Sequence, residues 1–510
     1  MSRLPVIVIV ALLLTPLAWG QSIEPAARAY RKAHGAAILS EFRDLLSIPN
    51  HGRDTENIFR NAEYIRQQFA RRGVEMQLLS LPGQPDVPPL IYGRIDTPGA
   101  TRTIGIYVHY DGQPADASKW TNAPFEAVLY TRSIEDGGKR REFPEAGETI
   151  DPEWRLYGRS TGDDKAPLIA LLTALDALAA SDIAMTSNIR FMFEGEEEMG
   201  SPHLGQYFEQ YGDKFSDVDV WLICDGPVHQ SRRPQIVFGV RGITSLRITV
   251  YGASRYLHSG HYGNFAPNPA MMLSQLLASM KDEQGNVLIK GYYDSVEPLS
   301  AREQAALDAV PDIDDQLREE FGLAASENNN ESYLSRLLLP SLNIKGLESA
   351  TAGPTARNVI PTTATVAIDM RLVKGNDPRD MLDLVEAHIR EQGYHIVREE
   401  PDRKTRLTYP RIAKVTRGSG YRAARTSMDL PIVESLVRAA NRASDEEVIL
   451  MPSLGGSLPL YLFEEKLNTP TIIVPMANHD DNQHAPDENI RIANLWYGID
   501  LLGEILTMRP

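Results

Sequence analysis

The sequence predicts an α/β protein with a mainly parallel, mixed sheet, interrupted by a separate α+β domain. Apolar segments at residues 103–110, 188–193 and 219–224 each lead directly into acidic or histidine residues. Open α/β sheets present ligand groups in this way, at the carboxyl ends of their strands. Near residues 235–252 the pattern changes to long strands with alternating polarity, and α/β character resumes from about residue 426. We therefore expect a first domain at residues 21–240 and 424–510, with a second domain inserted at residues 241–423.

Length and composition place the chain among ordinary globular proteins. Its 510 residues exceed what one core usually supports, and 42% of them are hydrophobic and 24% charged. The net charge of −16 argues against nucleic acid or an anionic membrane as a main partner. Cys224 is the only cysteine, so an intrachain disulfide is excluded.

Residues 1–20 have the pattern of a secretory signal peptide. Arg3 precedes an apolar run that ends at Leu17, and Ala18-Trp19-Gly20 offers a small-residue cleavage site. A permanent anchor is the competing interpretation, but the apolar core is short for a membrane span and Pro16 interrupts it. We expect cleavage after Gly20 and an exported, periplasmic or secreted protein without a stable membrane span.

The first half of the chain alternates helices with strands. Two amphipathic helices are expected between residues 26 and 73, where apolar residues recur at positions 58, 62, 65 and 69. On the strand at residues 103–110, His109 and Asp111 would share a face, so Asp111 can accept a hydrogen bond from the far ring nitrogen of a metal-bound His109. A loop with Asp163 and Asp164 precedes a leucine-striped helix that starts at Lys165.

Acidic side chains gather after two of these strands. Glu194, Glu196, Glu197 and Glu198 occupy four of five positions after the strand at residues 188–193, and Asp225 ends the segment 219–225. Such a group is either a solvated loop or the mouth of a cation site, and the strand-end position favours the cation site. Acids at a helix start also complement the helix dipole, which explains Asp164 better than Asp163.

The inserted domain and the last part of the chain have their own elements. We expect helices at residues 269–280, 378–393 and 431–443, strands at 364–372, 395–398 and 471–474, and a polar, loop-rich insertion around residues 312–330. A flexible loop at residues 454–457 and a segment rich in acids and histidines after residue 474 complete the chain.

Five segments together resemble the di-zinc exopeptidases related to carnosinase and cytosolic dipeptidase, aminoacylase and carboxypeptidase G. In chain order they read YVHYDGQP, YGRSTGDDKAP, EGEEEMGS, ICDG and QHAPDEN. The resemblance covers most of the chain and implies a zinc-exopeptidase-like catalytic domain with an inserted lid and dimerisation domain. It also implies two Zn²⁺ per chain, with Mn²⁺ or Co²⁺ as alternatives.

The resemblance assigns roles to residues of these segments. One zinc would be held by His109, Asp163 and Asp225, and the other by Asp163, Glu198 and His484, which leaves each ion an open position for water. Glu197 would be the catalytic base, and Asp111 would orient His109.

Further similarities lie in the inserted domain and after it. In YLHSGHYGN, the resemblance implies that His258 reaches the active site of a partner subunit and polarises the scissile carbonyl. Asn358 and Arg371 would hold the substrate, and the loop with Gly456 and Ser457 would close over it. A homodimer formed through the inserted domain is the implied assembly.

Two features depart from the family pattern. Ser160 and Ala166 replace glycines around the bridging acid, and since only glycine enters positive φ freely, we expect a distorted loop there. His479 lies five residues before His484 and is a rival metal ligand, but the QHAPDEN context favours His484.

The expected activity is hydrolysis of an amide bond next to a free carboxylate, in a dipeptide or short peptide. Glu197 would move the proton of the attacking water to the leaving amine, and Arg371 would bind the substrate carboxylate. An amidohydrolase acting on N-acyl amino acids is the alternative within enzymes. A catalytically inactive binding relative is the alternative outside them.

Overall fold

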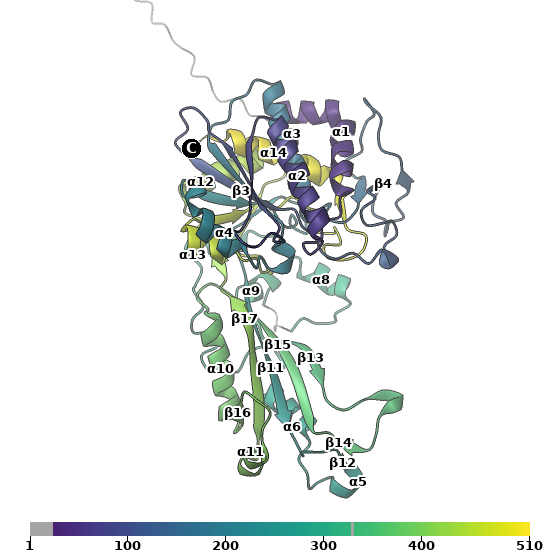
Figure 1. Cartoon of the computed structure of the whole chain (residues 1–510), viewed down its shortest axis with the longest axis vertical. Helices are drawn as coiled ribbons and strands as arrows, with labels where there is room; N and C mark the ends of the chain where they lie inside the picture. Colours follow the sequence, from purple (N-terminus) through teal and green to yellow (C-terminus); the bar gives the residue numbers. More distant parts are fainter. Residues whose placement is uncertain (1–23, 328–330, 510) are drawn as a thin grey trace, which may run out of the picture.

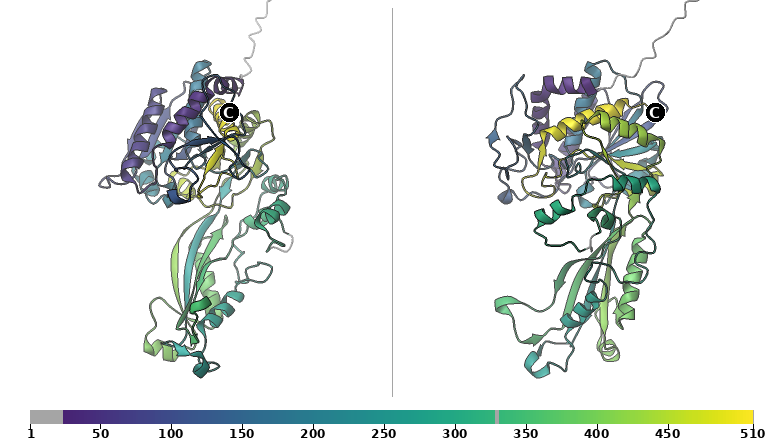
Figure 2. Two further views of the ribbon diagram at one scale, coloured as in Figure 1. Left: turned by 90° about the vertical axis from the view of Figure 1, so that its right-hand side faces the viewer. Right: turned by 180° about the vertical axis from the view of Figure 1, so that it is seen from behind.

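The computed structural model describes residues 24–327 and 331–509, which form two bodies (Figure 1). One body is built on an eight-stranded sheet, and the other, built on a five-stranded sheet, extends away from it in every view (Figure 2). The predicted signal peptide lies outside the described residues. Within those residues, no helix combines the length and the apolar character that crossing a bilayer requires.

The eight-stranded sheet is mixed, with the order β1-β2-β7-β3-β8-β20-β9-β19. The pairs β3-β7, β3-β8 and β8-β20 are parallel. The pairs β1-β2, β2-β7 and β20-β9 are antiparallel. Its strands are β1 (Glu75–Leu79), β2 (Leu90–Ile95), β3 (Thr103–His109), β7 (Asn188–Glu194), β8 (Val220–Ile223), β9 (Gln235–Val237), β19 (Ile449–Met451) and β20 (Thr471–Ile473).

Helices cover both faces of this sheet. One face packs against α1 (Glu24–Leu46), α2 (Thr55–Arg71), α3 (Ala166–Ala180), α12 (Pro431–Arg442) and α14 (Ile492–Thr507). The other packs against α4 (Leu204–Tyr211) and α13 (Tyr461–Leu467). Alternation along β3 explains both contacts, because Ile106 and Val108 face the first layer and Tyr107 faces the second.

Several short elements complete this body. A four-stranded sheet has the order β21-β6-β4-β5. Its strands are β4 (Val128–Tyr130), β5 (Arg140–Arg141), β6 (Arg155–Tyr157) and β21 (Asn489–Arg491), and single 3₁₀ turns are η1 (Ala117–Lys119), η2 (Glu197–Met199) and η3 (Gly212–Lys214).

The five-stranded body is an α+β unit with the sheet order β13-β15-β11-β17-β16, antiparallel except for the pair β16-β17. Its strands are β11 (Gly242–Tyr251), β13 (Asn343–Glu348), β15 (Thr363–Leu372), β16 (His395–Val397) and β17 (Ile412–Tyr421). Helices α6 (Pro269–Ala278) and α10 (Pro378–Glu391) share a core with this sheet. The predicted fold class, a mixed α/β sheet with an α+β second unit, is confirmed.

Smaller elements surround that sheet. The far tip contains β12 (Leu257–His258), β14 (Val359–Ile360) and α5 (Ser259–Tyr262), and α11 (Arg403–Thr408) lies at the same end (Figure 1). The 3₁₀ turn η4 (Gly353–Thr355) precedes β14. Between β11 and β15 the chain also forms α7 (Ala301–Asp308), α8 (Asp314–Phe321) and α9 (Tyr333–Leu337). The expectation of a loop-rich insertion at residues 312–330 is therefore wrong for α8.

The chain crosses between the two bodies twice, and the crossings lie side by side. Strand β10 (Gly239–Val240) enters the five-stranded body and pairs with β18 (Ala424–Arg425), which returns from it. The predicted domain boundaries, 240/241 and 423/424, fall beside this pair, and the division into domains stays a prediction.

Candidate metal centre and cleft

Parallel strand ends bring histidine and carboxylate side chains to one edge of the large sheet. His109 is the last residue of β3, Asp225 follows β8 by two residues, and Glu198 lies in η2 just after β7. Two loops add Asp163, before α3, and His484, between β20 and β21. The same edge therefore collects side chains from five segments that are far apart in the sequence.

These side chains form two groups that share one carboxylate. His109, Asp163 and Asp225 form the first group, and Asp163, Glu198 and His484 form the second, with ligand atoms within 4.8 Å of one another in each. Nε2 of His109 lies 2.8 Å from Oδ1 of Asp163. Nε2 of His484 lies 3.0 Å from the other Asp163 oxygen and 3.1 Å from Oε2 of Glu198.

The donor set fits a pair of divalent cations. Oδ1 of Asp225 is buried and makes no hydrogen bond, and the buried Nε2 of His109 lies between two carboxylates, 2.8 Å from Asp163 and 4.0 Å from Asp225. Burial, followed by the neighbouring Asp163 carboxylate, raises the pKa of Asp225 to about 7. Buried carboxylates in contact are costly unless positive charge balances them, and mixed imidazole and carboxylate ligands suit zinc, manganese or cobalt.

Asp111 holds three residues of the site in place. It is fully buried, and its two carboxylate oxygens accept hydrogen bonds from the backbone N–H groups of Glu197 and Glu198, each at 3.1 Å. Nδ1 of His109 lies 3.2 Å from the backbone carbonyl oxygen of Asp111 and 3.4 Å from Oδ1 of the Asp111 side chain. This contact fixes the ring so that Nε2 faces Asp163 and Asp225.

The loop that carries Asp163 closes without the expected glycines. Ser160 has a φ of 65°, and its Oγ accepts a hydrogen bond from Nδ2 of Asn50 at 2.9 Å. Ala166 is fully buried as the first residue of α3. Hydrogen bonds thus hold serine in the left-handed conformation, and Asp163 still reaches both histidines.

Several site residues had no predicted role. The buried carboxylate of Glu488 accepts hydrogen bonds from Nη1 of Arg159 at 2.7 Å and from the backbone N–H groups of Ser160, Gly162 and Asp163 at 3.0, 3.2 and 3.1 Å. Its only sequence signal was its place within QHAPDEN. Glutamine amides contact the metal groups directly: Nε2 of Gln113 donates to Glu198, and Nε2 of Gln483 donates to Asp163.

Asp164 does not have the environment that its position before a helix indicated. Its side chain is fully buried, and its Oδ2 accepts a hydrogen bond from the backbone N–H of His109 at 3.2 Å. Burial raises the pKa of its carboxyl well above the ordinary value. Asp164 therefore supports the end of β3, beside the metal groups.

A cleft of about 700 Å³ opens from the metal groups toward the five-stranded body. Glu197 and Asp163 line it together with Arg371, Gly456 and Ser457. Nη1 of Arg371, at the end of β15, donates to Oγ of Ser457 at 2.7 Å, so the two bodies meet across the cleft.

The structure does not bring every predicted residue to this cleft. His258 is exposed on β12 and pairs with Val359 of β14, next to Asn358, at the far tip of the five-stranded body (Figure 1). Within one chain, neither His258 nor Asn358 lines the cleft, so their roles stay predictions that require a second chain. His479 belongs to neither metal group.

The chain has extensive similarity to known dipeptidases. The model of peptidase family M20/M25/M40 matches residues 105–508. The Cys-Gly metallodipeptidase DUG1 of Candida albicans is 27% identical over 491 residues, which cover 92% of this chain and 94% of that protein. The human Beta-Ala-His dipeptidase is 28% identical over 422 residues, which cover 81% and 75%.

Solved structures share the fold. The M20 family metallo-carboxypeptidase Sso-CP2 of Sulfolobus solfataricus has a TM-score of 0.73 at 25% identity, covering 92% of this chain and 98% of that one. The dinuclear metal-binding peptidase YXEP of Bacillus subtilis, also from family M20, has a TM-score of 0.52 at 13% identity, covering 94% and 98%.

The comparisons correct one expectation. The prediction of an exported, periplasmic or secreted protein is wrong on this comparison, because the DUG1 dipeptidases of three yeasts match 89–92% of the chain and give export no support.

The predicted enzyme class is confirmed by the same comparisons. Curated dipeptidases match most of the chain, and the two metal groups supply the ligand atoms that a metal-dependent hydrolase needs. The protein is a metallopeptidase-type hydrolase. Because the family model covers residues 105–508, the chain belongs to peptidase family M20/M25/M40.

Proposed function

We propose that this protein hydrolyses the amide bond of dipeptides or short peptides that end in a free carboxylate. The observation that carries the proposal is the cleft, which joins both metal groups and Glu197 to the guanidinium of Arg371. An arginine fork binds carboxylate in a bidentate manner. The names of two relatives agree, because Cys-Gly and β-Ala-His are both dipeptides with a free carboxylate.

The two metal groups would hold two zinc ions, with manganese or cobalt as alternatives. With Asp163 shared, each ion would have three protein ligands and would keep positions open for reactants. When bound, such ions supply Lewis acidity for the amide carbonyl and lower the pKa of water.

Glu197 is the proposed general base. Its backbone N–H is held by Asp111, its side chain lines the cleft, and it belongs to neither metal group. A carboxylate placed in this way can take the proton of the attacking water and deliver it to the leaving amine, a role typically worth 10²–10⁴-fold in rate.

Arg371 and Ser457 are the proposed anchor for the substrate carboxylate. They come from different bodies, so a bound substrate would join the two bodies. In a homodimer formed through the five-stranded body, His258 of the partner subunit would polarise the scissile carbonyl, and Asn358 would contact the substrate. This assembly is part of the proposal and would be tested by the mass of the protein in solution.

The decisive experiment compares the wild type with Glu197→Gln on a dipeptide panel, with metal content measured in both. We expect the variant to retain its metal and lose at least about 100-fold in kcat, because amide nitrogen cannot accept the proton. Glu196→Gln is the matched control, since the Glu196 carboxylate is bound to Nδ1 of His203 at 2.8 Å and does not line the cleft. Unchanged turnover in Glu197→Gln would refute the assigned base.

The same panel separates the alternatives. N-acetyl amino acids share the free carboxylate and would use the same Arg371 contact, so faster turnover of acyl substrates than of dipeptides would replace the proposal with an N-acyl amino acid amidohydrolase. Protein that binds two metals per chain but hydrolyses neither class would be an inactive binding relative.

A further inference from the structure

The short helix α9 reaches the cleft although it belongs to the insertion between β11 and β15. Tyr333 and Leu337, at its two ends, line the same cleft as Asp163 and Glu197. Figure 1 places α9 directly below the eight-stranded body. The mechanism proposed above does not use this helix.

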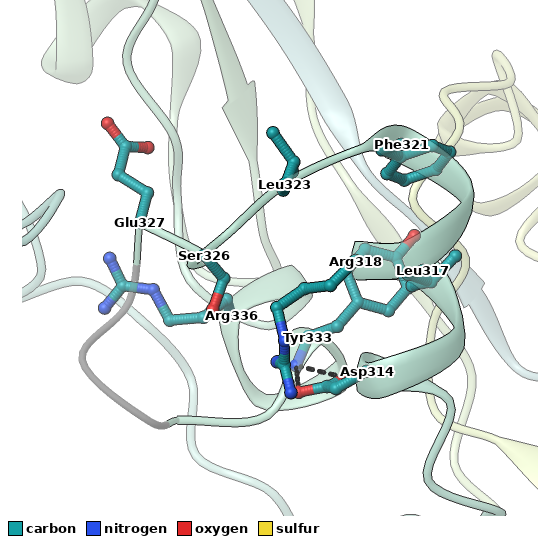
Figure 3. A pocket seen from close by; sticks show the side chains of 9 residues that line it. All are labelled: Asp314, Leu317, Arg318, Phe321, Leu323, Ser326, Glu327, Tyr333 and Arg336. Carbon is teal, nitrogen blue, oxygen red and sulfur yellow. Dashed lines mark hydrogen bonds between the residues drawn. The ribbon is translucent and has the colours of Figure 1, made fainter.

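Local contacts fix the start of α9. The backbone N–H of Tyr333 donates to both carboxylate oxygens of Asp314, at 3.2 and 3.1 Å, which ties α9 to the first turn of α8 (Figure 3). Oγ of Ser332 caps the helix by accepting a hydrogen bond from the backbone N–H of Ser335. Leu334 is buried in the core of the eight-stranded body, so packing also holds the helix in place.

The helix lies on the side of the cleft where Arg371 anchors the carboxylate. Nη2 of Arg241 donates to the carbonyl oxygen of Leu339, just after α9, at 2.7 Å and approaches the carbonyl oxygen of Arg371 at 3.4 Å. A Cβ added to Gly455 would lie 3.2 Å from Leu337. Leu337 therefore packs against the loop that carries Ser457, the partner of Arg371.

Apolar side chains from both bodies surround this position. We use the name apolar wall for a set of cleft residues that share this character: Val240, Tyr333, Leu337, Tyr421 and Leu454. Val240 and Leu454 come from the junction, Tyr421 ends β17, and the ring of Tyr421 stacks on Tyr461 of α13 at 5.3 Å. Arg371, which lines the cleft, is assigned to the substrate carboxylate.

We propose that the apolar wall receives the side chain of the C-terminal residue of the substrate, so that the enzyme prefers an apolar or aromatic residue there. This inference rests on the proposed function, because it takes Arg371 as the carboxylate anchor. A side chain beside that carboxylate would lose water contact against Leu337 and Tyr333, whereas glycine leaves the wall unfilled. Among the described residues that line the cleft, Arg371 is the only arginine or lysine, so aspartate would find no second one there.

The test uses the metal-loaded full-length enzyme and four dipeptides with the same first residue: Ala-Leu, Ala-Phe, Ala-Gly and Ala-Asp. We expect kcat/KM for Ala-Leu and Ala-Phe to exceed that for Ala-Gly and Ala-Asp by at least about tenfold, the lower limit for one methylene in an apolar pocket. Tyr333→Ser and Leu337→Ser should each lower the ratio of Ala-Leu to Ala-Gly severalfold, mainly through KM.

Two controls separate the wall from general damage. Leu323→Ser changes a leucine that is 51% exposed in the same insertion but does not line the cleft, and it should leave the ratio unchanged. Leu337→Met keeps the apolar surface and should keep the preference. Tyr333 is 40% exposed, so its replacement tests the wall even if Leu337→Ser does not fold.

The outcomes distinguish failure of the apolar wall from failure of the proposed function. Hydrolysis of the panel with equal rates, or with glycine or aspartate preferred, overturns the apolar wall and leaves the proposed function intact. A preference for leucine that neither serine variant reduces also overturns it. If no dipeptide is hydrolysed, the proposed function fails, and the inference built on it fails too.

Discussion

At the scale of single residues, Glu488 holds the loop that positions Asp163. Its carboxylate receives four N–H donors, three of them from the backbone of the loop that carries Asp163. In Glu488→Gln, an NH₂ group would face these donors, so the loop must shift. We expect metal affinity to fall about 10- to 100-fold, as is usual when partners of metal ligands are changed. Titration of the apo protein with zinc against a competing chelator measures this change.

Glu446→Gln is the control for that experiment, because Glu446 is exposed and lies outside both the metal groups and the cleft. Both variants need a cooperative thermal transition before titration. Equal affinity in wild type and Glu488→Gln would show that Asp163 does not depend on Glu488.

Residue positions differ in how far the sequence predicts them. The apolar runs of β3 and β8 fix where those strands end, so the placement of His109 and Asp225 at one sheet edge follows from local pattern. Glu488 contacts residues that precede it by 325–328 positions in the sequence. Gln113 contacts Glu198, which lies 85 positions after it. No local periodicity encodes such contacts, and they were missed for that reason.

At the scale of elements, the end of β3 and the loop before α3 constrain each other. A Cβ added to Gly112 would overlap Oγ of Ser160 and lie 3.0 Å from Nδ2 of Asn50. We expect Gly112→Ala to lower the free energy of unfolding by about 1–3 kcal/mol, as overpacking usually does. The double variant Gly112→Ala with Ser160→Gly should recover part of that loss, because it removes the overlapping Oγ and suits the positive φ. Urea unfolding of the single and double variants checks this, and strictly additive effects would contradict it.

Helix α10 is tied to its sheet by a buried carboxylate. Glu386 accepts hydrogen bonds from Arg398 at 2.7 and 2.8 Å and from Arg417 at 2.8 Å. Burial acts to raise its pKa, but Arg417 and Arg398 outweigh burial and lower the pKa to about 2. Because the folded pKa lies below the ordinary value of about 4.3, this carboxylate stabilises the fold above that pH, and the contribution is lost as pH falls toward 2.

Glu386→Gln should therefore be less stable than the wild type at pH 7, and the difference should shrink as pH falls below about 4. Thermal unfolding followed from pH 7 to pH 3 measures the difference. Glu391→Gln, which changes an exposed residue at the end of the same helix, should match the wild type throughout. A constant gap between Glu386→Gln and the wild type at all pH values would be inconsistent with this linkage.

Elements are predictable when their periodic pattern is long. Helix α2 was expected from the spacing of Ile58, Ala62, Ile65 and Phe69, all of which are buried. Helix α8 buries only Leu317 over eight residues, so its apolar stripe is too short to show a period, and its polar sequence predicts a loop. The contribution of the insertion to the cleft could not be predicted for the same reason.

At the scale of the whole molecule, the cleft exists only because two bodies meet. Arg371 and Ser457 are 86 residues apart in the sequence and reach each other across the junction formed by β10 and β18. Sequence pattern predicts each body separately, whereas the angle between them depends on tertiary packing. Resemblance to a family supplied Arg371 and Ser457 as candidates, but their contact and the apolar side of the cleft depend on how the two bodies pack.

The two metal groups join distant parts of the chain, so metal binding is coupled to the stability of the fold. Their five ligands lie between residues 109 and 484, so the groups are assembled only when the eight-stranded body is folded. An ion that binds the folded state alone stabilises it by RT ln(1 + [L]/Kd), about 2.7 kcal/mol at a hundredfold excess over Kd.

We expect removal of metal with a chelator to lower Tm by several degrees and added zinc to restore it. His484→Ala, which removes one ligand of the second group, should reduce the shift without abolishing it, because the first group keeps His109, Asp163 and Asp225. Differential scanning calorimetry with metal analysis on the same samples measures both effects, and a Tm that is identical with and without bound metal would show that these side chains hold no ion that stabilises the fold.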